Sequence, residues 1–189
     1  MKLFIASDIH GSAYYTELML KRYCESGAEK LILLGDILYH GPRNELPREY
    51  DPKAVIEMLN KAGDDILAVR GNCEAEVDDM VLEFDVSSNY MMIFDAGITI
   101  FATHGHRPKP KTHDRDILLC GHTHVPTVEV RENCVYMNPG SVSIPKEASP
   151  HSYIIYENGI FSWYDMENLE CYMEYEPVLD KNGDVDDDE

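Results

Sequence analysis

The stretch Lys2–Ser12, KLFIASDIHGS, decides the fold of this chain. Its first part, Lys2–Ser7, is a short apolar run rich in β-forming residues, and it leads directly into a carboxylate and an imidazole. Ser12 is a good N-cap, so the pattern predicts that a helix begins there. The apolar spacing of that helix continues until Gly27, before which we expect it to end.

The same order of strand and helix repeats along the first half of the chain. Lys30–Gly35 and Asp65–Gly71 are again short apolar runs that resemble strands. Between them, Asp51 and Pro52 form an N-cap and N1 pair for a helix that we expect to reach about Ala62. A chain that alternates strands and helices in this way predicts a parallel sheet in an α/β domain.

After Tyr90 the pattern changes to successive strands, which we expect to be mostly antiparallel. These predicted strands are Met91–Phe94, Ile98–Thr103, Ile117–Cys120, Thr127–Arg131, Val135–Met137 and a pair around Asn158-Gly159. The sequence contains neither an internal repeat nor a Gly/Ser-rich linker, which predicts a single domain over residues 1–179, folded as a two-sheet sandwich with flanking helices. Residues 180–189 are acidic and lack a hydrophobic face, which predicts a disordered tail.

The composition restricts the partners and the cellular location. The chain has 16 basic and 35 acidic side chains, a net charge of −19, so we expect no stable nucleic-acid complex. A phosphorylated substrate would need a local positive site. Five scattered cysteines without a C-x-x-C pair fit neither a disulfide framework nor a zinc ribbon. With no signal region and no apolar run of membrane-spanning length, we expect a cytoplasmic protein without membrane attachment.

Five of the predicted strands are followed by Asp, Asn or His at the end where α/β sheets bind ligands. These residues are Asp8, His10, Asp36, Asn72, His104, His122 and His124. Residues two apart on an extended backbone share a face, so we expect both side chains of the D-x-H pair, and of the H-x-H pair, to point the same way. Each residue alone could equally be a helix cap, a turn residue or a structural histidine, but their convergence predicts a metal centre.

The types of ligand indicate which metal the centre would hold. Two aspartates, one asparagine and four histidines suffice for two divalent ions if one carboxylate bridges them. Four imidazoles favour a first-row transition metal, with Mn²⁺ as the first choice and Fe, Zn, Ni or Mg as alternatives. With two carboxylates and a bridging hydroxide, the cluster would keep a charge of roughly +1, which attracts a phosphate into an acidic protein.

In order and spacing, these motifs resemble those of the calcineurin-like metallophosphoesterase superfamily. The motifs are Asp8-x-His10, Gly35-Asp36, Gly71-Asn72, His104 and Gly121-His122-x-His124. With His40–Asn44, Gly71–Glu74, Thr103–His106 and Asn138–Lys146, they look closely like the small bacterial phosphodiesterases of the YfcE type. The resemblance implies a four-layer α/β/β/α sandwich made of two mixed sheets with flanking helices.

The resemblance also implies the ligands of each ion and the reaction. It implies Asp8, His10, Asp36 and His124 as ligands of one ion, and Asp36, Asn72, His104 and His122 as ligands of the other. A metal-bridging hydroxide would attack the phosphorus of a small phosphodiester in line, so the chain is expected to be a hydrolase acting on ester bonds. Asp36, which would bridge, is then a catalytic residue together with Asn72 and His104.

One position departs from the superfamily pattern. Many members carry a histidine after the metal-binding asparagine, where it can protonate the leaving group, and this chain has Cys73. A thiol could donate that proton, and the alternative is that Cys73 only lines the pocket. Four further residues are candidates for substrate contact, with a surface-loop role as the alternative: His40, Arg43, Asn44 and His106.

Two other functions compete with this interpretation. The first is a catalytically weak scaffold or binding module on the same fold, as in a retromer subunit whose site is degraded, although all seven ligand positions are intact here. The second is a metal-dependent hydrolase of another bond, such as an amide, which the ligand set alone does not exclude. In addition, the Tyr- and Met-rich stretch Tyr153–Tyr175 predicts an apolar edge that could support a homo-oligomer.

Overall fold

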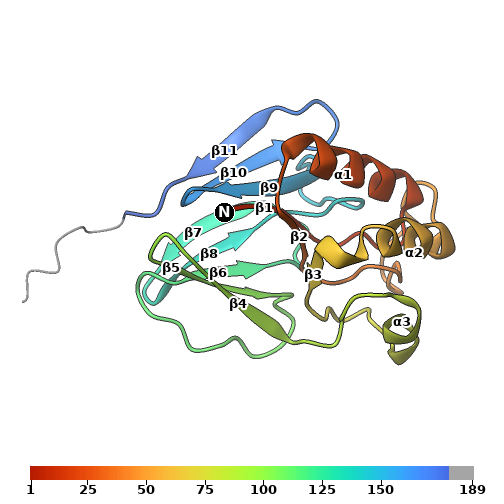
Figure 1. The fold of residues 1–189 in the computed structure, drawn as a ribbon, viewed down its shortest axis with the longest axis horizontal. Helices are drawn as coiled ribbons and strands as arrows, with labels where there is room; N and C mark the ends of the chain where they lie inside the picture. Colours follow the sequence, from red (N-terminus) through yellow and green to blue (C-terminus); the bar gives the residue numbers. More distant parts are fainter. Residues whose placement is uncertain (179–189) are drawn as a thin grey trace, which may run out of the picture.

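The chain forms two β-sheets that face each other across an apolar core (Figure 1). The computed structural model describes residues 1–178, and the tail predicted at residues 180–189 lies outside them. The predicted sandwich of two mixed sheets with flanking helices is confirmed. Within residues 1–178, no helix has the length and hydropathy that a membrane span requires.

The first sheet has six strands in the order β11-β10-β9-β1-β2-β3. Its strands are β1 (Lys2–Ala6), β2 (Lys30–Leu33), β3 (Ile66–Ala68), β9 (Ser152–Glu157), β10 (Ile160–Asp165) and β11 (Cys171–Tyr175). β1, β2 and β3 run parallel, as the alternation of strands and helices predicts, and β9 pairs antiparallel with β1. The carboxyl ends of the three parallel strands therefore lie at one edge of the sheet.

Two helices cover the face of this sheet that points away from the second sheet (Figure 1). The helices of the described chain are α1 (Ala13–Ser26), α2 (Pro52–Asn60), the 3-10 turn η1 (Gly63–Asp65) and α3 (Glu76–Val81). α1 begins as predicted, because the Ser12 hydroxyl accepts the backbone N–H of Tyr15, and it ends at Gly27, where φ is 67°. α2 ends at Asn60 rather than near Ala62, because the chain then tightens into η1.

The second sheet has five strands in the order β4-β5-β6-β8-β7. Its strands are β4 (Tyr90–Asp95), β5 (Ile98–Thr103), β6 (Ile117–Cys120), β7 (Thr127–Arg131) and β8 (Cys134–Asn138). The antiparallel pairing expected after Tyr90 holds at both edges of this sheet and among β9, β10 and β11, but β5, β6 and β8 run parallel. Residues 104–116 form the crossover that makes β5 and β6 parallel.

Two apolar cores hold the layers together. The core between the sheets includes Ile5, Ile32, Ile100, Leu119 and Trp163. The core between the first sheet and its helices includes Phe4, Met19, Leu31, Val55 and Leu59. Both faces of β1 and β2 are therefore buried, which explains why these strands are continuous apolar runs instead of alternating ones.

The outer face of the second sheet carries a smaller apolar cluster that includes Phe101, Leu118 and Tyr136. Within the described residues, no helix follows α3. The loop of residues 104–116 reaches this cluster, where Lys109 places its Nζ 4.8 Å from the centre of the Tyr136 ring. Its segment 107–111, RPKPK, cannot form an amphipathic helix because two prolines and three cations interrupt it.

Exposed apolar side chains lie both in the stretch where we expected them, at Leu169 and Tyr172, and on another edge strand. In the stretch Tyr153–Tyr175, the side chains of Tyr153 and Trp163 are buried. The edge strand β4 exposes 51%, 45% and 69% of three side chains on one face, those of Tyr90, Met92 and Phe94. The edge strands β4 and β11 thus both expose apolar side chains, and a homo-oligomer stays a prediction.

Candidate metal centre

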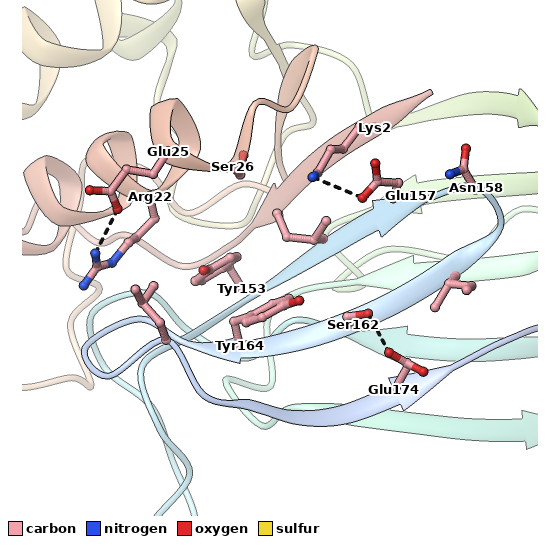
Figure 2. A pocket seen from close by; sticks show the side chains of 13 residues that line it. Lys2, Arg22, Glu25, Ser26, Tyr153, Glu157, Asn158, Ser162, Tyr164 and Glu174 are labelled. Carbon is pink, nitrogen blue, oxygen red and sulfur yellow. Dashed lines mark hydrogen bonds and ion pairs between the residues drawn. The ribbon is translucent and has the colours of Figure 1, made fainter.

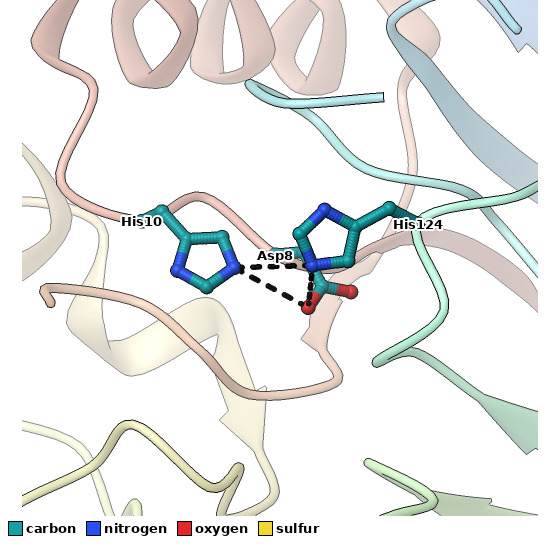
Figure 3. A group of neighbouring side chains, drawn as sticks. All are labelled: Asp8, His10 and His124. Atoms are coloured by element: carbon teal, nitrogen blue, oxygen red, sulfur yellow. Dashed lines mark hydrogen bonds and ion pairs between the residues drawn. The ribbon is translucent and has the colours of Figure 1, made fainter. Parts of the chain in front are cut away.

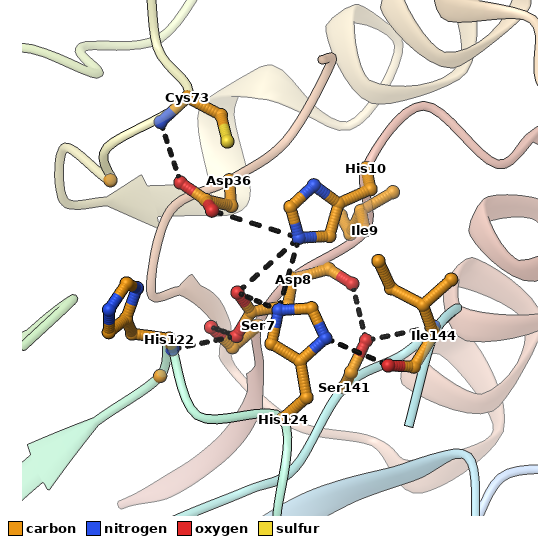
Figure 4. Close-up of polar contacts among 12 residues, drawn as sticks. Ser7, Asp8, Ile9, His10, Asp36, Cys73, His122, His124, Ser141 and Ile144 are labelled. Atoms are coloured by element: carbon orange, nitrogen blue, oxygen red, sulfur yellow. Dashed lines mark hydrogen bonds and ion pairs between the residues drawn. The ribbon is translucent and has the colours of Figure 1, made fainter. Parts of the chain in front are cut away.

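Five strands from both sheets deliver polar residues to one site. Figure 4 shows the residues that follow three of these strands, β1, β2 and β6, gathered at the site. Asp8 and His10 follow β1, Asp36 follows β2, Asn72 follows β3, His104 follows β5, and His122 and His124 follow β6. The structure brings all seven of these residues together in one connected set of short contacts. Residues distant in the sequence thus meet because the carboxyl ends of the strands share one edge.

The backbone at most of these residues is left-handed instead of extended. φ is positive at Asp8 (58°), His10 (50°), Asp36 (56°), His122 (71°) and His124 (64°). Non-glycine residues seldom adopt this conformation, and they gather at functional sites where the surrounding structure enforces it. β1 and β2 end earlier than we expected, at Ala6 and Leu33, whereas β6 ends at Cys120 as predicted. The ligands stand on the turns that follow these strands.

The left-handed turns change which side chains meet. The D-x-H pair converges as expected, with Nε2 of His10 3.6 Å from Oδ1 of Asp8. The two imidazoles of the H-x-H pair, however, do not share a side. The His122 ring lies 5.1 Å from that of His104, whereas the His124 ring lies 5.0 Å from that of His10. The expectation of a common face for this pair is wrong because the backbone there is not extended.

Asp8, His10 and His124 form the first group that could hold a metal ion (Figure 3). Nε2 of His124 lies 3.2 Å from Oδ1 of Asp8 and 3.3 Å from Nε2 of His10. All three side chains are buried. The second oxygen of Asp8 is held by two donors, the Ser7 hydroxyl at 2.6 Å and the backbone N–H of His122 at 3.0 Å. Only Oδ1 of Asp8 is left facing the two imidazoles.

Asp36, His104 and His122 form the second group. Nε2 of His104 lies 3.4 Å from Oδ1 of Asp36 and 3.1 Å from Oδ1 of Asn72, so the asparagine joins this group. The other oxygen of Asp36 lies 3.7 Å from Nε2 of His10, which belongs to the first group. Asp36 therefore presents one carboxylate oxygen to each group.

Backbone carbonyls fix which nitrogen of each buried histidine carries a proton. Nδ1 of His10 donates to the carbonyl of Tyr39 at 2.8 Å. In the same way, Nδ1 of His104 donates to the carbonyl of Leu34 at 2.6 Å, and Nδ1 of His124 donates to the carbonyl of Ile144 at 2.8 Å. A carbonyl can only accept, so in the neutral rings the lone pair is on Nε2, the atom that faces the carboxylates. A second hydrogen bond of this kind is usual for histidines that bind metals.

This arrangement fits a cation better than it fits hydrogen bonds among the side chains. Oδ1 of Asp8 is buried and has no hydrogen-bond donor, although Nε2 of His10 and of His124 both lie within 3.6 Å of it. With both imidazoles neutral, three acceptor atoms converge and no proton lies between them. Buried charge requires compensation, and a divalent ion bound by the three atoms would supply it.

In the absence of ions, protons provide part of this compensation. Burial opposes the ionisation of Asp8, but the imidazoles of His10 and His124 outweigh it and hold the pKa of Asp8 well below its ordinary value. Burial alone would also lower the pKa of His104, but the carboxylates of Asp36 and Asp8 raise that pKa to about 9. A metal ion would therefore have to displace protons from the histidines.

Glu74 is a buried side chain that ties two ligand loops together, and we did not assign it a role from the sequence. Its Oε1 accepts the backbone N–H of Ile37 at 2.7 Å. Its Oε2 accepts the N–H of Asp36 at 3.0 Å and that of Gly71. Gly71 has to be a glycine, because a Cβ there would collide with the backbone and the carboxylate of Asp36. The only sequence signal for Glu74 is its place in the Gly71–Glu74 motif.

The site opens into a cavity of about 310 Å³. Four of the predicted ligands line it: Asp36, Asn72, His122 and His124. Two of the predicted substrate contacts, Arg43 and Asn44, line it as well, together with Cys73. Lys146 is a further lining residue that we did not single out from the sequence, where its only signal is its place at the end of the Asn138–Lys146 motif.

The two other predicted substrate residues lie outside this lining. The His40 ring packs edge-on against the rings of Tyr39 and Tyr50. The His106 ring lies 5.3 Å from that of His104, and its Nε2 accepts the Nε–H of Arg107 at 3.1 Å. Burial and the neighbouring His104 lower the pKa of His106 to about 4, so this ring is neutral at pH 7. Both histidines contact the loops around the cavity instead of its interior.

A larger cavity, of about 560 Å³, lies between α1 and the strands β9, β10 and β11 (Figure 2). Its wall includes the stacked rings of Tyr153 and Tyr164. Neither of the two candidate metal-binding groups shares a residue with this wall. Its cations are already paired, since Lys2 contacts Glu157 at 3.1 Å and Arg22 contacts Glu25 at 2.9 Å. The smaller cavity, which the candidate metal ligands line, is therefore the better candidate for the active site.

Comparison with known proteins gives consistent matches over most of the chain. The sequence profile of the calcineurin-like phosphoesterase superfamily domain matches residues 1–158. The phosphodiesterase YfcE of Escherichia coli K12 is 45% identical over 166 residues, which cover 86% of this chain and 90% of that protein. These matches confirm the resemblance that the ligand motifs indicated.

Solved structures agree with the fold. A structure of the E. coli phosphoesterase Yfce superposes with a TM-score of 0.90 at 42% identity and covers 94% of this chain and 100% of that one. Wild-type Vps29 from Entamoeba histolytica, complexed with zinc, superposes with a TM-score of 0.61 at 17% identity, covering 93% and 98% of the two chains. At that identity the second likeness concerns the fold alone.

Proposed function

The chain belongs to the calcineurin-like phosphoesterase superfamily, and we propose that it is a phosphodiesterase that works with two divalent metal ions. One observation carries the proposal. Asp36 stands between two groups of buried donors, with Oδ2 3.7 Å from Nε2 of His10 and Oδ1 3.4 Å from Nε2 of His104. A carboxylate so placed can bridge two ions, and the name of the E. coli relative supports a diester as the substrate.

The donor sets follow the two groups. Asp8, His10, Asp36 and His124 would hold one ion, and Asp36, Asn72, His104 and His122 the other. When bound, the ions would supply Lewis-acid stabilisation of the phosphoryl group and a hydroxide generated from water near neutral pH. Four imidazoles support Mn²⁺ as the first choice, with Fe, Zn, Ni and Mg as alternatives.

The remaining chemistry belongs to side chains of the chain itself. Asn72 and His122 line the cavity, where they can hold the phosphoryl oxygens against the rest of the site. His104 is kept in one orientation by its hydrogen bond to the carbonyl of Leu34, which maintains the arrangement around Asp36. Burial and the carboxylate of Asp36 raise the pKa of the Cys73 thiol, so this residue keeps its proton and is a weak acid for the leaving group.

The size and charge of the site support a small substrate. A cavity of about 310 Å³ is at the lower end of the roughly 300–1,000 Å³ that is usual for small-molecule sites. The net charge of −19 disfavours a stable nucleic-acid complex. A cytoplasmic location and a homo-oligomer stay predictions; the five free cysteines support the first, and the exposed apolar side chains of β4 support the second.

Two rival functions make different predictions. A scaffold or binding module on this fold would not need the orphaned Oδ1 of Asp8 or the shared position of Asp36, both of which favour a working metal centre. A hydrolase of amides or carboxylic esters would use the same ligands on another bond. The class of bond that the protein hydrolyses therefore distinguishes a phosphodiesterase from a hydrolase of amides or carboxylic esters.

The test is a substrate panel on protein that has been stripped of metal and reloaded with each candidate ion. We expect Mn²⁺-loaded protein to hydrolyse bis(4-nitrophenyl) phosphate, and to leave 4-nitrophenyl acetate and a 4-nitroanilide untouched. Inorganic phosphate should inhibit the reaction. Faster cleavage of the acetate or the anilide would support the second rival, and protein that binds no metal and turns over no substrate would support the scaffold.

Two variants check that the activity comes from this site. His104→Ala should abolish turnover, because it removes a donor of the second group. His113→Ala is the matched control, since the His113 side chain is exposed and the residue contacts the described chain through its backbone. Equal activity of the two variants would contradict the assignment of the site.

A further inference from the structure

Two cationic side chains line the cavity beside the candidate metal centre. Arg43 comes from the loop after β2, and Lys146 comes from the segment that follows β8. Asp36 is the one acidic residue in the lining, and it belongs to both candidate metal sites. Within residues 1–178, neither cationic side chain takes part in a hydrogen bond or an ion pair.

Arg43 and Lys146 differ from most cationic side chains of the described chain, which already have a partner. The chain has 35 acidic and only 16 basic side chains. Most of the basic side chains among residues 1–178 contact a carboxylate, a carbonyl oxygen or an aromatic ring. Lys30, for example, contacts Asp65 at 3.0 Å, and Arg131 packs over the ring of Tyr136. Two unpaired cations at one cavity are therefore available to an anion from outside the protein.

The backbone ties Lys146 to a candidate metal ligand. Its N–H donates to the carbonyl of His124 at 3.2 Å, while the His124 ring donates to the carbonyl of Ile144 at 2.8 Å. The next two residues, Glu147 and Ala148, both adopt left-handed backbone with φ of 55° and 56°. Strain of this kind is kept where the structure must hold a residue in place, and here it fixes the path of the chain beside His124.

A closed turn carries Arg43 to the same cavity. Gly41 has a φ of 78°, and its carbonyl accepts the backbone N–H of Asn44 at 3.3 Å. The side-chain amide of Asn44 donates to the carbonyl of His40 at 2.9 Å and closes the turn a second time. Arg43 is thus carried by a hydrogen-bonded turn, and Asn44 beside it also lines the cavity.

The positive charge at the cavity exceeds the single negative charge of a simple phosphodiester. A diester carries one negative charge, and two divalent ions with their carboxylates and a hydroxide keep roughly +1. Arg43 and Lys146 bring two further positive charges to the same cavity. We propose, on the basis of the proposed function, that the substrate is a small phosphodiester with a second anionic group, a carboxylate or a phosphate, and that Arg43 and Lys146 bind this second group.

Binding of two matched phosphonates tests the proposal without turnover. 3-Phosphonopropionate carries a phosphonate and a carboxylate, whereas propylphosphonate lacks the carboxylate. By calorimetry on Mn²⁺-loaded protein, we expect the first compound to bind about tenfold tighter, because its carboxylate gains charge-assisted hydrogen bonds. The preference should fall in high salt, since both cations are exposed.

Variants separate this subsite from the metal centre. Lys146→Met should remove most of the preference and leave the affinity for propylphosphonate unchanged, and Lys146→Arg should retain the preference. Lys61→Met is the control, because it removes the same charge from an exposed residue outside the cavity. Equal affinities of the wild type for the two compounds would overturn the proposal. An equal loss of affinity for the two compounds in Lys146→Met would also overturn it, because the lysine would then bind the phosphonate beside the metal ions.

The proposed function is tested separately with 4-nitrophenyl propyl phosphate, a diester without a second anion. Hydrolysis of this compound, combined with equal binding of the two phosphonates, would refute only the second-anion subsite. A clear preference for 3-phosphonopropionate without any hydrolysis would refute only the phosphodiesterase. The two failures therefore have different signatures.

Discussion

Glu74 shows how one buried side chain can control a site that it does not enter. Its carboxylate accepts backbone N–H groups from the two loops that carry Asp36 and Asn72. Glu74→Gln would place an amide N–H₂ against those donors, so we expect metal affinity to fall by about 10–100-fold. Calorimetric titration with Mn²⁺ measures this, and Glu76→Gln, at an exposed position, is the matched control. Equal affinities of the two variants would show that Glu74 does not position the ligands.

His104 makes the stability of the metal-free protein depend on pH. The pKa of His104 is about 9 in the folded chain, against an ordinary value of about 6.5. A raised pKa contributes stability that is complete below pH 6.5 and is lost as the pH rises through 9. Protein in chelator should therefore melt at a lower temperature at pH 9.5 than at pH 6.5. His104→Asn should remove much of this difference, and a wild-type melting temperature that rises with pH would contradict the assignment.

At the scale of elements, the loops after the strands set the geometry of the site. Gly71 follows β3, and a Cβ at this position would collide with Asp36 in the loop after β2. Gly71→Ala should cost about 1–3 kcal/mol of unfolding free energy and weaken metal binding. In Gly63→Ala the nearest atom to the new Cβ lies 3.9 Å away, so that variant should stay within about 1 kcal/mol of the wild type. Urea denaturation of both variants measures the difference, and equal losses would show that the close approach at Gly71 is unimportant.

The elements also show what could be predicted from the sequence. The apolar runs that become β1, β2, β5 and β6, and the caps of α1, follow from local patterns, so the convergence of Asp8, Asp36 and His104 could be expected. The split between His122 and His124 could not be expected, because it depends on left-handed turns that no periodicity reveals. Glu74 and Lys146 were missed for a related reason, since their roles come from loop contacts between distant segments.

At the scale of the whole molecule, an acidic protein has to attract an anionic substrate. The net charge of −19 repels phosphate, whereas the candidate metal centre with Arg43 and Lys146 offers positive charge at the smaller cavity. The cations of the larger cavity, Lys2 and Arg22, are already paired with carboxylates. Association with substrate should therefore depend on the ions more than on the surface.

The same cavity offers little help to a poor leaving group. Cys73 follows the candidate ligand Asn72 and lines the cavity, and burial and Asp36 raise the pKa of its thiol. Positioned proton donors contribute typically 10²–10⁴-fold, so diesters with 4-nitrophenol as leaving group should react at least about 100-fold faster than alkyl monoesters. Initial rates with Mn²⁺-loaded protein measure this, and equal rates on both classes would contradict the account.

The central claim is that seven side chains from five strands hold two ions on either side of Asp36. Anomalous X-ray scattering at the manganese edge, from crystals of Mn²⁺-loaded protein, tests it most directly. We expect two peaks roughly 3.5–4 Å apart, one beside Asp8 and one beside His104, with the Asp36 carboxylate between them. A single peak, or peaks away from Asp36, would contradict the claim.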